Sequence, residues 1–377
     1  MRKLLLWAAL LSGATPSAWA AEPDQPSPRI LTLRPVGARE LRIEFNYNFR
    51  DTIVPPFEKE PAFEGKEIAR GLIPTVPPTP LVRNITDREL YLKPDHGRDF
   101  TAGPLATYKS QCDDGAHVYF QNLRVSSERE SLAIPYTVDL YTYQHGCGGW
   151  FMVRSGWTGS LDLDGRSWRL TIVDNLDGRI DAADRLFLED RRPADGMPVS
   201  HECPVPQTLF LGGHCFRLDC AYKAVEAGVV LEAALTEIQL PMGELKVEAN
   251  GCRSLSLCEE RRILFLDKPE GTIAVPAGRY RVDNCVLNSE PDQRLGLTFA
   301  RYDREISVQP GQATFLRLGL PLRNTVAVTR DRNRLHLTYQ LVGAGGEVYR
   351  DLDVRNRPFF RIYKGPLRIA GGTFGFG

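Results

Sequence analysis

Apolar and polar residues alternate with a period of two in short runs along most of the chain. Clear examples are Leu41–Tyr47, Trp168–Val173, Ala313–Leu318 and Arg334–Leu341. This alternation is typical of β-strands with one buried face, because a helix would repeat every 3.6 residues instead. Turn-forming pairs of glycine, proline and aspartate fall between the runs. The pattern therefore predicts an all-β chain of tandem Ig-like or prealbumin-like β-sandwich domains with little helix.

Only Ala221–Ala234 is a fair helix candidate, and its Gly228-Val-Val-Leu centre fits a strand equally well. Prolines and changes of composition predict where the chain divides, because proline lacks the donor that a central strand needs. The predicted parts are a signal peptide (1–20), an N-terminal β domain with a proline-rich loop (21–118), a cysteine-containing β-sandwich with an acidic turn (119–240), a prealbumin-like β-sandwich (241–322) and a C-terminal Ig-like β module (323–377).

The first residues have the features of a secretory signal peptide. Arg2 and Lys3 precede an apolar run, and Ala18-Trp19-Ala20 supplies small residues at the expected cleavage site. The run is too short to cross about 30 Å of hydrocarbon, and no later stretch is long and apolar enough to do so. We therefore expect an exported protein, periplasmic, secreted or at the cell surface, with no transmembrane segment in the mature chain.

Charge is balanced, with 47 basic and 47 acidic residues in the 377. The basic residues are scattered among acids along the sequence, whereas a nucleic-acid-binding surface needs a clustered basic excess. We expect no nucleic-acid partner. The sequence leaves the partner open between a carbohydrate and another protein.

Eight cysteines lie in the middle half of the chain, and an even number in an oxidising compartment predicts up to four disulfides. The sequence does not resolve their pairing. His201 and His214 lie near three of these cysteines, but export favours disulfides over a zinc site. The cysteines are Cys112, Cys147, Cys203, Cys215, Cys220, Cys252, Cys258 and Cys285.

The stretch Val173–Asp184 contains four aspartates and an asparagine around Gly178. With this glycine at position 6 of an EF-hand-type loop, oxygen-bearing residues fall at positions 3, 5, 9 and 12, which are Asn175, Asp177, Asp181 and Asp184. Position 1 is a valine, and the preceding residues are strand-like where an EF-hand has a helix. The alternatives are a β-turn held by side-chain-to-backbone hydrogen bonds and a loop that binds a structural calcium. We expect no other cofactor.

Aromatic residues are concentrated between Asp139 and Trp157. Alternation places Asp139, Tyr141 and Tyr143 on one face of a strand. An exposed face of this kind would be a platform on which sugar rings stack, whereas a buried one would be ordinary core packing. The candidate ligand platform comprises Tyr141, Tyr143, Trp150 and Trp157.

The segment Val275-Pro-Ala-Gly-Arg-Tyr-Arg-Val282 makes a tight turn followed by a strand whose tyrosine is expected to point inward. It resembles the turn of prealbumin-like and carboxypeptidase-regulatory-like modules. Together with Glu60-Pro-Ala-Phe-Glu-Gly-Lys66 and the turns within Leu90–Thr101 and Val173–Asp184, it makes the chain similar to a group of uncharacterised exported bacterial β-sandwich proteins. This resemblance implies architecture and carries no activity.

No sequence motif of a nucleophilic hydrolase, a metalloprotease or a phosphate-binding loop is present. The function that the sequence favours is therefore an exported, non-catalytic binding or structural protein. The alternative is a periplasmic hydrolase or sugar-processing enzyme whose carboxylate site is assembled between domains.

Overall fold

The computed structural model describes residues 27–37, 45–49, 57–60, 62–113, 117–143, 149–191, 200–290, 293–302, 304–332, 334–351 and 359–374. Within these ranges the regular structure consists of strands, and the predicted all-β fold is confirmed. Ala221–Ala234 lies in a β-hairpin, so its strand alternative is correct. The described residues contain no helix of the length and apolarity that crossing a membrane requires. The predicted signal peptide lies outside the described residues.

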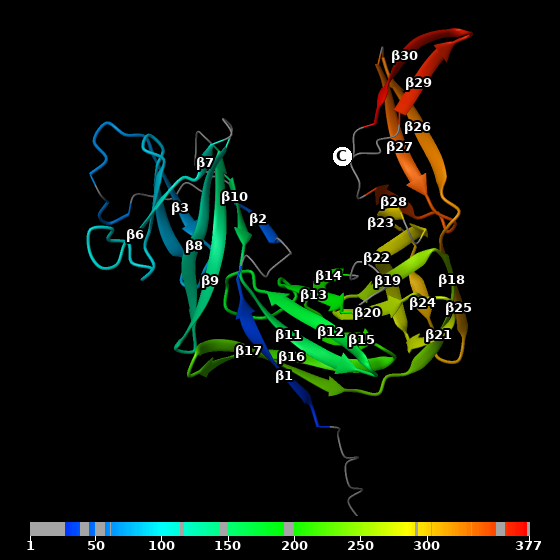
Figure 1. Ribbon diagram of the computed structural model, residues 1–377, viewed down its shortest axis with the longest axis horizontal. Coiled ribbons are helices and arrows are strands. Elements are labelled where there is room, and N and C mark those ends of the chain that lie inside the picture. The colour runs from blue at the N-terminus through cyan, green and yellow to red at the C-terminus, as the bar shows by residue number, and fades with distance from the viewer. Residues whose placement is uncertain are drawn as a thin grey trace, which may run out of the picture.

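Two sheets lie together at one end of the molecule, drawn in blue to green in Figure 1. One has the order β2-β10-β9-β8-β7 and the other β3-β4-β5-β6. Their strands are β2 (Phe45–Phe49), β3 (Ile68–Ile73), β4 (Thr79–Asn84), β5 (Glu89–Leu92), β6 (Ala106–Lys109), β7 (Cys112–Asp113), β8 (His117–Arg129), β9 (Leu132–Tyr143) and β10 (Gly149–Val153). Phe120, Leu140 and Phe151 from the first sheet share a buried cluster with Leu90 and Leu92 from the second.

A long, continuous sheet connects the rest of the molecule, in the order β14-β13-β12-β11-β1-β17-β16-β15-β20-β19-β22-β23-β28-β27-β26, with β24 paired to β22. Its first half comprises β1 (Arg29–Val36), β11 (Gly156–Leu163), β12 (Arg166–Val173), β13 (Arg185–Asp190), β14 (Ser200–Pro204), β15 (Thr208–Leu211), β16 (His214–Val225) and β17 (Gly228–Glu237). Its second half comprises β19 (Cys252–Glu259), β20 (Arg262–Asp267), β22 (Gly278–Glu290), β23 (Gln293–Arg301), β24 (Ile306–Val308), β26 (Arg323–Asp331), β27 (Arg334–Val342) and β28 (Val348–Asp351).

A three-stranded sheet, β21-β18-β25, shares a second buried cluster with β19, β20 and β22. Its strands are β18 (Met242–Asn250), β21 (Gly271–Pro276) and β25 (Ala313–Gly319). The strands of this two-layer unit lie between Met242 and Gly319, and its prealbumin-like character stays a prediction. Tyr280 of the Pro-x-Gly-x-Tyr segment is fully buried there and donates to the Pro276 carbonyl at 2.8 Å. The inward tyrosine predicted from the sequence is therefore present.

Strand pairing does not follow the predicted boundary near residue 118. β1 pairs with β11 and β17, and β2 and β7 pair with β10 and β8. Residues 21–118 are thus interleaved with residues 119–240, because hydrogen-bonding partners far apart in the sequence complete each other's sheets. The proline-rich loop, expected over residues 51–80, is also shorter than expected, since β3 and the start of β4 fall within that range.

The C-terminal residues differ from the predicted Ig-like module. β26 and β27 form one hairpin, and β29 (Phe359–Lys364) and β30 (Leu367–Thr373) form another. None of the residues described in these four strands is buried. The two hairpins, which we call the C-terminal arm, project from the strands around β18–β25 in Figure 1 and have no sandwich core of their own.

Candidate functional site

An aromatic ladder crosses three neighbouring strands. Tyr119 on β8 lies directly opposite Tyr141 on β9, which lies opposite Trp150 on β10. The ring centroids of Tyr119 and Tyr141 are 4.1 Å apart, and those of Tyr141 and Trp150 are 5.1 Å apart with an interplanar angle of 7°. Tyr143 meets Trp150 edge-on at 6.3 Å. We call these four residues the aromatic strip.

The strip lies on the partly exposed face of its sheet. Tyr119, Tyr141 and Trp150 are half-buried, and Tyr143 is 51 % exposed. The alternating residues Leu140 and Thr142 are buried, as expected from the period of two. Because the three stacked rings cover each other's inner faces, a ligand would meet ring edges and hydroxyl groups along the middle of the strip and ring faces at its ends.

Polar groups surround one side of the strip. The buried Asp139 carboxylate accepts hydrogen bonds from the Tyr119 hydroxyl at 3.1 Å and from Arg154 Nε at 2.7 Å. Gln121 Nε2 donates to the Tyr119 hydroxyl at 2.8 Å. Burial and a hydrogen bond with the Tyr119 hydroxyl raise the pKa of Tyr141, so its hydroxyl stays protonated.

The prediction that Trp157 belongs to the ligand platform is wrong. This side chain is 1 % exposed and packs edge-on against Tyr136 and Tyr222, with centroids 5.8 and 4.9 Å away. It lies on β11 in the long sheet, whereas the other three candidates lie on β9 and β10. Trp157 is therefore a core residue.

The acidic turn connects β12 to β13, and its carboxylates accept backbone hydrogen bonds. Asp177 Oδ1 accepts from Arg179 N at 2.8 Å and Asp181 Oδ1 from Ala183 N at 2.7 Å. Asp184 accepts from Asn175 N at 2.7 Å and from Asp181 N at 2.6 Å. These are the side-chain-to-backbone bonds of an Asx turn, the first of the two alternatives for this loop.

Asp174 is not among the calcium ligands predicted from the sequence, but its carboxylate organises this loop. Its carboxylate is fully buried and accepts from the hydroxyls of Tyr136 at 2.8 Å and Tyr222 at 2.6 Å. Burial raises the pKa of Asp174 to about 6. Burial and then the charge of Asp174 raise the pKa of Asp184 to about 8. The loop therefore holds two carboxyl groups, those of Asp174 and Asp184, in surroundings that disfavour their charged forms.

No three His, Cys, Asp or Glu side chains in the described part of the chain are grouped as a metal site requires. Calcium binding by Asn175, Asp177, Asp181 and Asp184 consequently stays a prediction. His214, considered from the sequence for a zinc site, lies between two acids. Its Nδ1 is 2.9 Å from Glu237 and its Nε2 is 2.9 Å from Asp164.

The loop between β5 and β6 has the same arrangement of Asx turns as the acidic turn, but a lysine ammonium lies inside it. Between β5 and β6, Asp95 Oδ1 accepts from Gly97 N and Asp99 Oδ1 from Thr101 N, which gives two consecutive Asx turns four residues apart, as at Asp177 and Asp181. Both the acidic turn and the loop between β5 and β6 are therefore hairpin turns built on two successive Asx turns.

The buried ammonium of Lys93 lies inside this β5–β6 loop. It donates to Asp95 at 3.1 Å and to the carbonyls of Ala102 and Pro104. Gly103 leaves room for it, because a Cβ there would be 3.1 Å from Lys93 Nζ and 2.8 Å from Asp95 Oδ2. An ion is therefore unnecessary in the loop between β5 and β6.

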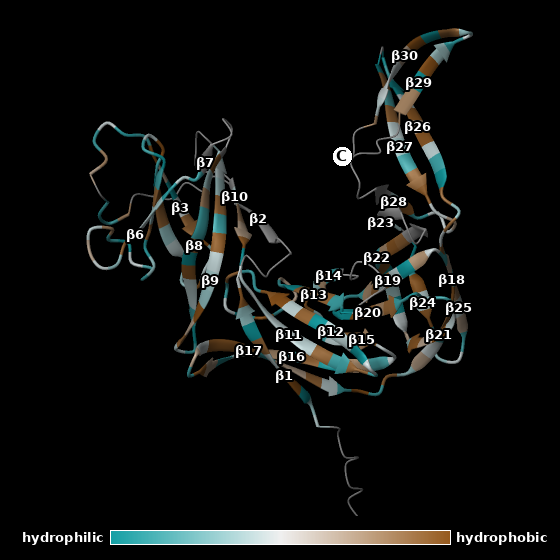
Figure 2. Ribbon diagram, viewed as in Figure 1, coloured by the Kyte–Doolittle hydropathy of each residue, from teal (hydrophilic) through white to brown (hydrophobic). Residues whose placement is uncertain are grey.

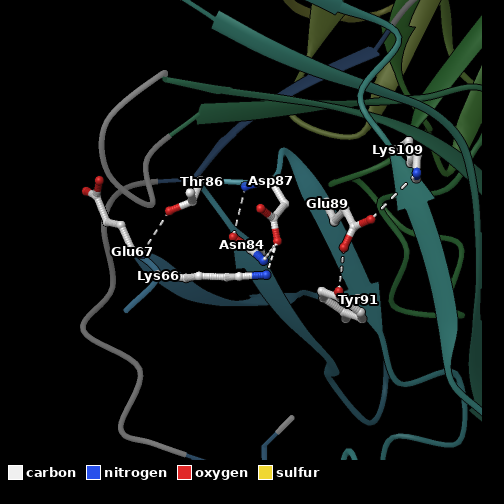
Figure 3. A network of polar contacts seen from close by, with 8 residues as sticks. All are labelled: Lys66, Glu67, Asn84, Thr86, Asp87, Glu89, Tyr91 and Lys109. Atoms are coloured by element: carbon white, nitrogen blue, oxygen red, sulfur yellow. Dashed lines mark hydrogen bonds and ion pairs between the residues drawn. The ribbon is translucent and has the colours of Figure 1, made fainter. Parts of the chain in front are cut away.

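The sheet β3–β6 carries a further polar network at its surface (Figure 3). Lys66 and Asn84 both donate to the Asp87 carboxylate, and Asp87 N donates back to Asn84 Oδ1. The bond from Lys66 lowers the pKa of Asp87. Tyr91 donates to Glu89, and this bond raises the pKa of Tyr91 to about 12. These contacts fix the conformation of the β4–β5 turn, and each polar side chain named here takes part in one of them.

A cavity of about 660 Å³ opens at the ends of β15, β19, β20 and β22. Two of the three carboxylates that line it lie beside arginines: Glu259 is 3.1 Å from Arg262, and Glu305 is 3.9 Å from Arg279. The cavity is lined by Gln207, Thr208, Cys258, Glu259, Glu260, Arg261, Arg262, Arg279, Arg281 and Glu305.

Six cysteines have free thiols in the described structure: Cys203, Cys215, Cys220, Cys252, Cys258 and Cys285. Two of these are close together, because Cys252 Sγ lies 3.5 Å from Cys285 Sγ across β19 and β22. Cys147 lies outside the described residues.

Sequence reasoning missed Tyr119, Gln121 and Arg154 at the strip. Alternation in the run from His117 to Phe120 places Tyr119 and Gln121 on one face, but the register that puts Tyr119 opposite Tyr141 depends on strand pairing. Asp174 was missed because the spacing of an EF-hand places it between two ligand positions.

Comparison with protein-family models, with curated proteins and with solved structures finds no match to this chain.

Proposed function

We propose that this chain is an exported, non-catalytic binding protein whose ligand surface is the aromatic strip. The observation that carries the proposal is the stack of Tyr119, Tyr141 and Trp150 on a partly exposed sheet face, with Tyr143 exposed beside it. Export is supported by the signal-peptide features of residues 1–20.

A carbohydrate chain is the ligand class that this surface fits best. Sugars present apolar C–H faces and hydroxyl edges, and the strip offers aromatic carbon beside tyrosine hydroxyls, Gln121 and the Asp139–Arg154 pair. A protein partner is the alternative occupant, and the experiment below separates the two.

Trp150→Ala is expected to weaken glycan binding about tenfold or more, the equivalent of about 1.4 kcal/mol, because it removes the end of the ring stack. A glycan array on the full chain identifies the ligand, and titration calorimetry measures the change. Phe315→Ala is the matched control, since Phe315 is also an exposed aromatic residue on a strand but lies on β25.

A blank array, or equal affinity of wild type and Trp150→Ala, would contradict the carbohydrate proposal. Cross-linking to a protein at Tyr143, with no glycan bound, would assign the strip to a protein partner.

The hydrolase alternative would use the cavity beside β19 and β22, because several glutamates line it. If the hydrolase alternative is correct, the wild type releases reducing sugar and Glu260→Gln does not. Glu259 and Glu305 in this cavity each lie beside an arginine, and this engagement of their oxygens in ion pairs favours the binding function.

We further propose that Cys252 and Cys285 form a disulfide in the exported protein. Their sulfurs are 3.5 Å apart on neighbouring strands, so oxidation needs a movement of about 1.5 Å to reach the usual S–S bond length of about 2.05 Å. Peptide mapping without reductant is expected to find residues 252 and 285 linked. Alkylation of both thiols in the protein purified from an oxidising compartment would contradict this prediction.

The resemblance to exported bacterial β-sandwich proteins is also kept as a proposal. It is supported by the buried Tyr280 after the Pro276 turn and by the two acidic hairpin turns.

A further inference from the structure

Exposed apolar side chains gather on the C-terminal arm. Seven of the fifteen large apolar side chains found exposed in the described chain lie on its strands. Four belong to the β29–β30 hairpin: Phe359 (70 % exposed), Tyr363, Leu367 (66 % exposed) and Ile369. Val326, Val328 and Leu335 belong to the β26–β27 hairpin. Figure 2 shows hydrophobic positions interspersed with hydrophilic ones along the arm.

The arm is amphipathic, as the strand register shows. On β26–β27, Val326 lies opposite Tyr339 and Val328 opposite Leu337, while Thr325 lies opposite Gln340 on the other face. Side chains that share a face of a hairpin form one surface. One face of this hairpin is therefore apolar and the other polar.

The second hairpin packs beside the first through aromatic contacts. The Phe374 ring lies 5.3 Å from Tyr339 and 5.0 Å from Phe360. Phe360 and Ile362 are half-buried, whereas Phe359 and Tyr363, on the alternate positions of β29, are exposed. Phe359 and Tyr363 on β29, and Leu367 and Ile369 on β30, are therefore apolar side chains that the described chain leaves exposed.

The arm is also strongly cationic. The β29–β30 hairpin contains Arg361, Lys364 and Arg368 and no acidic residue. Residues 323–342 add four arginines against a single acid, Asp331. The arm has a net charge of about +6, although the whole chain has equal numbers of basic and acidic residues. Within the described residues none of these cations forms an ion pair with an acid.

We propose that the C-terminal arm docks on the surface of an anionic lipid bilayer, with the exposed apolar side chains of the β29–β30 hairpin in the interface. Exposed aromatic and aliphatic side chains enter the boundary between headgroups and acyl chains, and the flanking lysine and arginines meet lipid phosphates. Figure 1 shows this hairpin at the end of the arm, away from β18–β25, where it can reach a flat surface.

Charge complementarity and apolar exposure together select this partner. A soluble polyanion would pair with the cations but would leave Phe359 and Leu367 in water, whereas an anionic bilayer accommodates both kinds of side chain. Each basic residue near an anionic surface contributes about 1 kcal/mol, a factor of about five in partitioning.

The test is sedimentation of the full chain with vesicles. Vesicles of phosphatidylcholine containing phosphatidylglycerol are expected to bind the protein at least about tenfold more tightly than pure phosphatidylcholine vesicles. Leu367→Ser/Ile369→Ser and Lys364→Gln/Arg368→Gln should each lower binding to the anionic vesicles about tenfold. Both pairs of side chains are exposed, so the melting temperature should stay unchanged.

Phe315→Ser and Arg317→Gln are the matched controls, because both side chains are exposed on β25 outside the arm. They should bind vesicles as the wild type does. Equal binding to both kinds of vesicle, or arm variants that bind normally, would overturn the proposal.

Two other outcomes would overturn it in favour of a different occupant. Binding to heparin that depends on Lys364 and Arg368 but not on Leu367, without vesicle binding, would identify a soluble polyanion. Self-association in ultracentrifugation that is lost in Leu367→Ser/Ile369→Ser, again without vesicle binding, would identify a second copy of the chain.

Discussion

Replacing Trp157 with alanine is expected to lower the free energy of unfolding by about 3–5 kcal/mol. The indole is buried between Tyr136 and Tyr222, so the truncation leaves a cavity where β9, β11 and β16 meet. Chemical denaturation of the wild type and the variant measures the difference. A loss below about 1 kcal/mol would contradict a core position, since core truncations of this size cost several times more.

Trp157→Phe provides the matched control for this substitution. The buried indole Nε1 has no hydrogen-bond partner, so phenylalanine loses ring volume without breaking a hydrogen bond. We expect it to cost less than about 1.5 kcal/mol. Glycan binding should persist in Trp157→Phe, whereas Trp150→Ala should lose it, and this contrast separates the core tryptophan from the strip.

Stability should fall as the pH rises from about 4 to about 8 in the absence of divalent cations. Burial raises the pKa of Asp174 in the folded protein from the ordinary 3.8 of an aspartate to about 6, and that of Asp184 to about 8. Between the ordinary 3.8 and these raised values the two carboxyls therefore hold more protons in the folded chain than in the unfolded chain, which favours folding at the acidic end. The buried His201, whose pKa burial lowers to about 4, acts in the opposite sense below 6.5 and makes the change smaller.

Thermal unfolding at pH 5 and pH 8 with a chelator present measures this effect. We expect the melting temperature to be lower at pH 8 than at pH 5 by about 5 °C or more. A loss of 1 kcal/mol in the free energy of unfolding lowers the melting temperature by roughly 2–4 °C in a domain of moderate size. Asp184→Asn should flatten the dependence, and Asp162→Asn, an exposed position on β11, should leave it unchanged. An equal or higher melting temperature at pH 8 would refute the prediction.

Calcium provides a second test of the same loop. A cation beside Asp177, Asp181 and Asp184 would offset the repulsion between carboxylates, so calcium is expected to raise the melting temperature at pH 8 more than at pH 5. The double variant Asp177→Asn/Asp181→Asn should lose this gain. If calcium leaves the wild type unchanged, the loop is held by Asx turns alone.

The all-β fold could be predicted from sequence because alternation is a local property. Trp168–Val173 and Arg334–Leu341 lie in strands as their patterns indicate. The ambiguous Ala221–Ala234 could not be decided locally, since its strands depend on the pairing of β16 with β17 and of β17 with β1.

The candidate site was predicted only in part, for a related reason. Composition drew attention to Tyr141, Tyr143 and Trp150, and the strand period placed the tyrosines on one face. The same composition included Trp157, although the turn between β10 and β11 carries it into a different sheet. Proximity in sequence is a poor guide to proximity in space wherever a chain changes sheets.

The position of β1 in the middle of its sheet affects how this protein folds. It lies between β11 and β17, pairing Arg34 with Thr158 and Leu33 with Leu231. A ribosome or a translocation pore delivers β1 long before either partner, so the sheet stays open at its middle until residue 237 has emerged. Contacts of such long sequence separation slow folding. Strands that wait for distant partners expose unpaired edges, so this topology is prone to aggregation until β17 has been synthesised.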